Sequence, residues 1–82
     1  LMDVFPQELI NVEVKSKPDI ENVPRLIAAI RQAERELGEE GRILVRYSGT
    51  QNICRVMVEG PTDEVTARYA RTLADIVKEE LA

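Results

Sequence analysis

The sequence predicts an α+β fold, a two-layer sandwich in which two helices cover one face of a small antiparallel sheet. Three observations predict it: three segments in which apolar and polar residues alternate, two segments in which apolar residues recur every three or four positions, and a short polar loop between the second and third strands. The elements follow in the order β-α-β-β-α, and 82 residues provide material for one domain.

The first strand is expected over residues 9–14. Ile10, Val12 and Val14 fall on one face of this segment, and polar residues fall on the other. An alternation with a period of two residues is typical of a strand that buries one face. The polar sequence at 16–19, which contains a proline, then ends the strand.

A helix is expected to follow, beginning near Asn22 and ending at Gly38. Asn22 can cap its first turn, and Pro24 suits that turn, where a missing N–H costs nothing. Glycine is the residue preferred just beyond the end of a helix. The apolar stripe, with charged residues opposite it, consists of Leu26, Ile27, Ile30, Ala33 and Leu37.

Two further strands are expected on either side of a short loop. The second strand begins at Gly41, and the third runs over residues 53–59. The inner-face residues are Ile43, Val45 and Tyr47 in the second strand and Cys54, Val56 and Val58 in the third. Because the loop between them is short, the two strands are expected to pair as an antiparallel hairpin.

The final helix follows Gly60 and Pro61, which stop the third strand. Thr62 can cap this helix, and Asp63 and Glu64 suit the positive end of the helix dipole. Its apolar stripe is expected to end near residue 81 and to consist of Val65, Tyr69, Leu73, Ile76 and Val77.

Composition excludes several classes of function. A net charge of −4 and a pI near 4.8 argue against a nucleic-acid partner, since duplex binding normally needs a basic face. No apolar run approaches the roughly 20 residues of a membrane span, and no stretch resembles a signal peptide, so we expect no membrane partner and a cytoplasmic location. Leu1 precedes Met2, and a strand-like segment begins within ten residues, so we expect a piece of a longer protein.

Residues for catalysis or metal binding are scarce. The chain has no histidine, which removes the commonest general base and the commonest zinc ligand. Cys54 is the single cysteine, so no internal disulfide or cysteine-based metal site can form, and we expect it to be a small core residue. No cluster of the D-x-D type is present to hold magnesium. We therefore expect neither a catalytic residue nor a metal ligand in this chain.

The segment from Arg46 to Arg55, RYSGTQNICR, has the features of an anion-binding site. By alternation, both arginines lie off the core face, near the mouth of one hairpin, where they can converge. Ser48 and Thr50 offer hydroxyl donors, and consecutive N–H groups around Gly49 can form a concave anion site. Because the arginine fork matches phosphate oxygens bidentately, phosphate is the anion that would use all these groups.

The same residues have other interpretations, which the sequence leaves open. The arginines can be solvated strand residues on either side of an ordinary turn. The uncovered face of the sheet can be a ligand-free interaction surface, with ion pairs among Glu13, Arg46, Arg55 and Glu59. A single-stranded nucleic-acid binder would need aromatic side chains on that face for base stacking, and none of the three aromatic residues is clearly placed there.

The loop and its flanking strands resemble a known family. Residues 41–50, GRILVRYSGT, followed by residues 53–60, ICRVMVEG, resemble the R-x-S-G-T-E-x-x-x-R phosphate loop of the α-D-phosphohexomutases, most of all that of the bacterial phosphoglucosamine mutase branch. Residues 5–14, FPQELINVEV, resemble the Y-P-Q-x-L-x-N-V-x-V segment of the same enzymes. The resemblance covers essentially residues 1–82, as the single C-terminal domain of a four-domain protein.

The resemblance implies a TATA-binding-protein-like α+β fold, usually with one more short strand than this sequence indicates. It implies an isomerase that converts a hexose 6-phosphate into a hexose 1-phosphate, in the nearest branch glucosamine phosphate for amino-sugar and cell-wall precursor synthesis. A phosphoserine and a magnesium ion would belong to other domains of the same chain. This domain would grip the non-transferring phosphate of the substrate through Arg46, Ser48, Gly49, Thr50 and Arg55.

The resemblance breaks at Gln51 and Asn52, where the family usually has Glu-Pro. Losing the carboxylate makes the loop more electropositive, and losing the proline frees its backbone. The departure puts the role of the usual glutamate in doubt but leaves the five phosphate-gripping residues intact. Glucose and mannose phosphates remain alternative substrates, because residues that distinguish the sugars lie mainly in the family's other domains.

Overall fold

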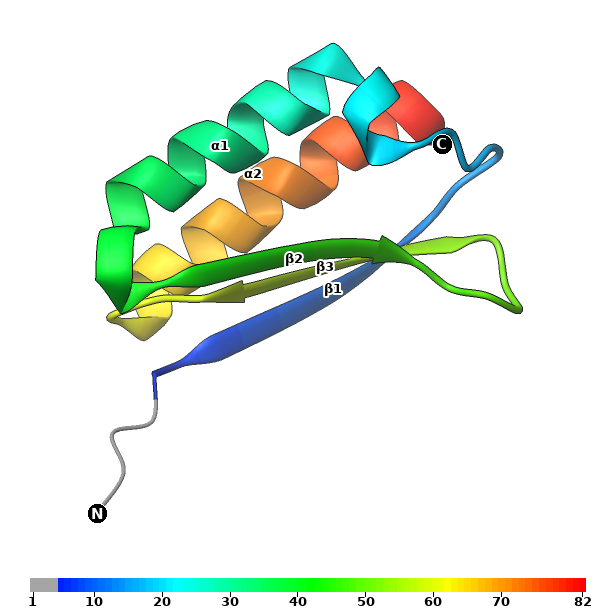
Figure 1. The fold of residues 1–82 in the computed structure, drawn as a ribbon. Coiled ribbons are helices and arrows are strands. Elements are labelled where there is room, and N and C mark those ends of the chain that lie inside the picture. The colour runs from blue at the N-terminus through cyan, green and yellow to red at the C-terminus, as the bar shows by residue number, and fades with distance from the viewer. Residues whose placement is uncertain (1–4) are drawn as a thin grey trace.

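A computed structural model describes residues 5–82. Its main elements, in chain order, are β1 (Gln7–Glu13), α1 (Pro24–Leu37), β2 (Arg42–Tyr47), β3 (Ile53–Glu59) and α2 (Asp63–Leu81). Short 3₁₀ turns at Ile20–Asn22 and Gly38–Glu40 flank α1. The two helices lie side by side on one face of the sheet and leave its other face uncovered (Figure 1). The predicted α+β sandwich and its β-α-β-β-α order are therefore confirmed.

The sheet has the strand order β1-β3-β2 and is antiparallel throughout. β3 has the predicted bounds and forms the predicted hairpin with β2. β1 begins at Gln7, two residues earlier than predicted, because Gln7 still pairs with Glu59 at the end of β3. The described residues contain three strands, so the additional short strand typical of the family is not seen within them.

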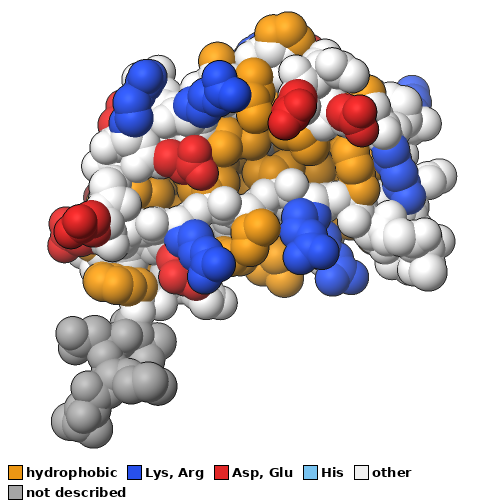
Figure 2. Space-filling view, in the orientation of Figure 1, with side chains coloured by type: hydrophobic (Ala, Val, Ile, Leu, Met, Phe, Trp, Pro, Cys, Tyr) orange, Lys and Arg blue, Asp and Glu red, His pale blue; other side chains and the backbone are white. Residues whose placement is uncertain are grey.

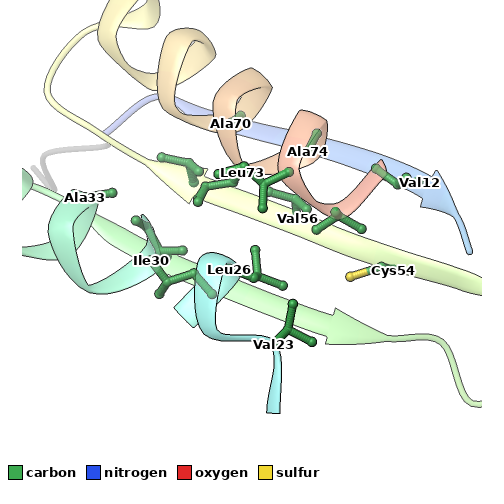
Figure 3. Close-up of a cluster of buried hydrophobic side chains, with 14 of the residues drawn as sticks. Val12, Val23, Leu26, Ile30, Ala33, Cys54, Val56, Ala70, Leu73 and Ala74 are labelled. Atoms are coloured by element: carbon green, nitrogen blue, oxygen red, sulfur yellow. The ribbon is translucent and has the colours of Figure 1, made fainter. Parts of the chain in front are cut away.

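The hydrophobic core fills the space between the sheet and the helices (Figure 3). Leu26 of α1, Val56 of β3 and Leu73 of α2 meet there and are shielded from solvent. Cys54 and Val58 are equally buried, as the alternation along β3 predicts. Burial raises the pKa of the Cys54 thiol, which keeps the sulfur protonated and unreactive. Cys54 is thus a core residue.

The predicted capping of α1 by Asn22 is wrong. Asn22 ends the preceding 3₁₀ turn, and Val23 occupies the position before the helix without a side-chain capping bond. Val23 is 5% exposed, so the chain enters the helix by burying an apolar side chain, and the 3₁₀ turn sets the direction of entry. Pro24 begins the helix as predicted, and Gly38 ends it with φ 59°, a conformation that favours glycine.

The predicted stripe of α2 is confirmed at Leu73, Ile76 and Val77, which are buried, whereas its first two members are only partly buried. Val65 and Tyr69, which were expected to face the sheet, are partly buried at the side of the helix, where the Tyr69 hydroxyl donates to Glu36 of α1. The small side chain of Ala70 lets the helix approach the sheet closely. Thr66 is accommodated inside because its hydroxyl donates to a backbone carbonyl one turn earlier, at 2.5 Å. The most deeply buried positions are Thr66, Ala70, Leu73 and Val77.

The start of α2 is capped as predicted, since Thr62 Oγ1 accepts a hydrogen bond of 3.2 Å from the Val65 N–H. Replacing Thr62 with alanine is expected to lower the free energy of unfolding by about 1 kcal/mol, measured by urea denaturation followed by circular dichroism. The control is Thr72→Ala within the same helix, which is expected to be neutral or slightly stabilising, because alanine is the better helix former. Equal losses in the two variants would contradict the capping role.

Candidate functional site

The loop between β2 and β3, residues 48–52, projects from one end of the sheet beyond both helices (Figure 1). The connection between β1 and α1 lies at the same end of the sheet. The base of the loop is closed by a hydrogen bond of 2.9 Å from the Ser48 N–H to the Ile53 carbonyl oxygen. The loop is thus open to solvent along its length and fixed to the sheet at its base.

Ser48 organises the loop from within. Its Oγ accepts hydrogen bonds from the N–H groups of Thr50, at 3.3 Å, and Gln51, at 3.2 Å. Two successive backbone N–H groups therefore donate to one side-chain oxygen atom, which closes the turn within the loop. The Ser48 hydroxyl still carries a hydrogen atom that it can donate to a ligand.

Gly49 is not required by the conformation of the loop. Its φ is not positive, and a Cβ atom added there would meet nothing within 4 Å. A side chain at this position would therefore meet neither backbone strain nor a steric clash with the described residues. The absent side chain leaves the Gly49 backbone open to close approach by a bound group.

Arg46 of β2 and Arg55 of β3 stand directly opposite each other on the uncovered face of the sheet, and both are exposed. Like charges directly opposite on neighbouring strands destabilise a sheet. Within residues 5–82, the ion pairs are those that Arg25 makes between the helices, so the alternative pairing with Glu13 or Glu59 is not formed. The two guanidinium groups face each other uncompensated, an arrangement that a bound anion would relieve.

All five predicted binding residues line one open pocket of about 510 Å³. Its polar part consists of Arg46, Ser48, Gly49, Thr50 and Arg55. Leu9, Leu44 and Met57 form an apolar wall beside the arginines, since they lie across the three strands in one row of the sheet register. Ligand pockets commonly enclose about 300–1,000 Å³, so this one can accommodate a sugar phosphate.

Two hydrogen bonds tie the loop to the connection between β1 and α1. Lys17 Nζ donates to the Ser48 carbonyl oxygen at 2.9 Å, and the Tyr47 hydroxyl donates to the Pro18 carbonyl oxygen at 2.5 Å. Burial raises the pKa of the partly buried Tyr47 hydroxyl, so it remains a donor at neutral pH. Neither contact could be predicted from the sequence, because the partners are 31 and 29 positions apart and no local pattern marks them.

The polar part of the pocket beside the loop is lined by arginine, hydroxyl and backbone groups. In the part of the chain that the structure describes, no three side chains of the types His, Cys, Asp and Glu lie close enough together to hold a metal ion. Ser48 has no histidine to activate it as a nucleophile. The geometry is suited to holding and orienting an anion.

The uncovered face of the sheet has an apolar row at its centre, formed by Leu9, Met57 and Leu44. Of the three aromatic residues, Tyr47 packs partly against the core, Tyr69 belongs to α2, and Phe5, 39% exposed, precedes β1. The described strands therefore carry no row of aromatic side chains on this face for stacking bases. Figure 2 views the molecule from the side, with the helices above the sheet, and there basic and acidic side chains are interspersed. No helix in the described range combines the length and apolar character needed to cross a bilayer.

The family model and the relatives that match this sequence belong to one group of sugar-phosphate mutases. Residues 9–76 match the family model described as phosphoglucomutase/phosphomannomutase, C-terminal domain. A phosphoglucosamine mutase of Syntrophobacter fumaroxidans is 64% identical over 78 residues, which are 95% of this chain and 17% of that protein.

Solved structures of related enzymes share the fold. A variant of Aspergillus fumigatus N-acetylphosphoglucosamine mutase in complex with glucose 1,6-bisphosphate is similar with a TM-score of 0.76 and 27% identity, over 92% of this chain and 15% of that one. The A. fumigatus enzyme in complex with GlcNAc-6P and magnesium gives a TM-score of 0.73 and 27% identity, over 92% and 16%. The chain thus spans about a sixth of the length of these proteins.

Proposed function

The chain belongs to the C-terminal domain family of the phosphoglucomutases and phosphomannomutases, and on that premise we propose that it is the phosphate-binding domain of a longer phosphoglucosamine mutase. The longer enzyme converts glucosamine 6-phosphate into glucosamine 1-phosphate. The choice of substrate is supported by the identity of 64% to a phosphoglucosamine mutase over nearly the whole chain. The remaining domains of the same polypeptide are its immediate partners.

In this proposal, the β2–β3 loop grips the phosphate of the sugar that is not being transferred. The observation that carries it is the uncompensated pair of Arg46 and Arg55 facing each other at the edge of the pocket. Their guanidinium forks bind phosphate oxygens, the hydroxyls of Ser48 and Thr50 donate to the same group, and the open backbone at Gly49 allows it to approach.

The domain contributes to the reaction by holding the substrate in position and by supplying positive charge next to its phosphate. Phosphoryl transfer depends mainly on the alignment of donor and acceptor and on stabilisation of negative charge. Holding the distant phosphate fixes the sugar, so that its other end meets the group that donates or accepts the phosphoryl unit. Magnesium, which is present in one related enzyme complex, would neutralise charge on the transferred group and would be bound by another domain.

Gln51 and Asn52 are compatible with this role. The Gln51 N–H takes part in the turn around Ser48, so the loop folds without the proline that the family usually has. Both side chains are exposed and neither adds a negative charge, so the loop remains favourable for an anion.

An isomerase assay of the longer protein that contains this chain tests the proposed function. We expect conversion of glucosamine 6-phosphate into glucosamine 1-phosphate, and no conversion by residues 1–82 alone. Parallel assays with glucose 6-phosphate and mannose 6-phosphate decide between this activity and that of a phosphoglucomutase or phosphomannomutase. Failure to isomerise any of the three sugar phosphates would overturn the proposal and favour a ligand-free interaction module.

A further inference from the structure

We propose that Lys17, which lies outside the phosphate loop, positions the loop for binding by fixing the orientation of the Ser48–Gly49 peptide. This inference rests on the proposed function and adds to it a residue from the connection between β1 and α1. Lys17 does not line the pocket. It acts through the backbone of the loop, as a positioning residue.

The hydrogen bond from Lys17 Nζ to the Ser48 carbonyl oxygen, at 2.9 Å, sets the direction of one peptide unit. The described residues contain no cis peptide bond, and in a trans peptide the C=O and the following N–H point in opposite directions. With its carbonyl held toward Lys17, the Ser48–Gly49 peptide directs the Gly49 N–H away from Lys17. Because Gly49 lines the pocket and Lys17 does not, that N–H is presented on the side of the anion.

The orientation needs such a restraint because glycine is permissive. A Gly49 peptide without the lysine can rotate at little cost, since glycine adopts positive and negative φ about equally well. Within residues 5–82, Ser48 Oγ accepts hydrogen bonds from the N–H groups of Thr50 and Gln51. Neither of these bonds involves the Gly49 N–H. Within the described residues, the bond to Lys17 is therefore the hydrogen bond made directly to a group of this peptide.

Lys17 is itself held in place. It precedes Pro18, and a residue before proline is confined largely to extended conformations. The Pro18 carbonyl oxygen accepts the hydrogen bond of Tyr47, the residue before Ser48. Two consecutive residues of the connection thus bind two consecutive residues of the hairpin, so the lysine is presented to the loop by a second, partly buried contact.

Lys15 provides a matched control for the charge of Lys17. It belongs to the same connection and is exposed, and its side chain has no hydrogen bond within residues 5–82. Lys15→Met removes one positive charge near the loop, whereas Lys17→Met removes the same charge together with the bond to Ser48. Lys17→Arg keeps the charge and a donor.

The experiment records ¹H–¹⁵N NMR spectra of the wild-type chain and these three variants, first without ligand and then during titration with inorganic phosphate at constant ionic strength. Lys17→Met is expected to move the Gly49 amide resonance before phosphate is added. It is also expected to weaken phosphate binding about three- to tenfold, the equivalent of one hydrogen bond. Lys15→Met and Lys17→Arg are expected to bind within about twofold of the wild type.

Equal weakening by Lys15→Met and Lys17→Met would show that Lys17 acts only through its charge, and would overturn the positioning role. An unmoved Gly49 resonance in Lys17→Met would also overturn it. If the wild-type chain binds phosphate and Lys17→Met binds it equally well, this inference fails alone. If the wild-type chain binds no phosphate, the proposed function fails and the inference fails with it.

Discussion

Replacing Arg46 with alanine is expected to weaken the binding of a phosphate ester by about ten- to a hundredfold. A hydrogen bond to a charged partner contributes about 1.5–3 kcal/mol, and each 1.4 kcal/mol is a factor of ten in affinity. In the longer enzyme, turnover and substrate affinity are both expected to fall, because the phosphate is held during the transfer step as well as before it. Steady-state kinetics with glucosamine 6-phosphate measure both quantities.

The matched control for Arg46 is Arg42, which lies four residues earlier on the same face of β2. Arg42 is exposed, stands opposite Glu59 and does not line the pocket. Arg42→Ala removes the same charge and is expected to change phosphate affinity less than about twofold. Arg46→Lys keeps the charge but loses the fork, and an intermediate affinity is expected. Kinetics and binding in Arg46→Ala that match the wild type would refute the role of Arg46.

The free energy of unfolding distinguishes a role of Arg46 in ligand binding from a role in stabilising the sheet. Arg46 faces Arg55 without a carboxylate, so Arg46→Ala is expected to leave the free energy of unfolding unchanged, or to raise it by up to about 0.5 kcal/mol at low salt. If a substitution weakens binding and leaves the free energy of unfolding unchanged or higher, the replaced residue serves ligand binding and not the stability of the fold. A marked loss of stability would indicate that the arginine supports the sheet instead.

The second large effect is expected in the core. Leu26→Ala is expected to lower the free energy of unfolding by about 2–5 kcal/mol, because it removes buried methyl groups and leaves a cavity between α1 and the sheet. The Leu26 side chain is 0% exposed and lies among residues of both helices and β3 (Figure 3). Since small domains are stable by only about 5–15 kcal/mol, the variant is expected to unfold at a much lower urea concentration.

Leu9→Ala is the control for this core substitution. The chemical change is identical, but Leu9 is 58% exposed on the uncovered face of the sheet. Its expected effect is within about 0.5 kcal/mol. Similar losses in the two leucine variants would mean that the helices do not pack on the sheet as described.

The fold was predictable from the sequence where an element is marked by residues next to one another in the chain. Alternation along residues 53–59 gave the bounds of β3 and its buried face, and Thr62 with its acidic neighbours marked the start of α2. Asn22 was misassigned because the choice between capping and burial at the start of α1 depends on the core that Val23 enters. The stripe of α2 was predicted correctly at Leu73, Ile76 and Val77, but the burial of Thr66 and Ala70 was missed. Periodicity draws attention to large apolar residues, whereas close packing on a sheet favours small ones.

The part of the candidate site that lies within the hairpin was predictable from the sequence, and its contacts with the rest of the chain were not. Arg46 and Arg55 flank one tight hairpin, so the pairing of its strands is enough to place them opposite each other. The contacts of Lys17 and Pro18 with the loop could not be predicted, because they depend on how the connection between β1 and α1 crosses the end of the sheet. The hydrogen bonds that Ser48 Oγ accepts within the turn could not be predicted either, because they depend on the conformation of the loop.

The most direct test of the account is an NMR titration of this chain with glucosamine 6-phosphate and, in parallel, with glucosamine. We expect shifts confined to the amides of residues 46–50 and 55, produced by the phosphate ester alone. One loop without the rest of an enzyme is expected to bind with a dissociation constant of about 1 mM or weaker. No shifts at tens of millimolar ester, or equal shifts with the unphosphorylated sugar, would contradict the claim that this loop binds phosphate.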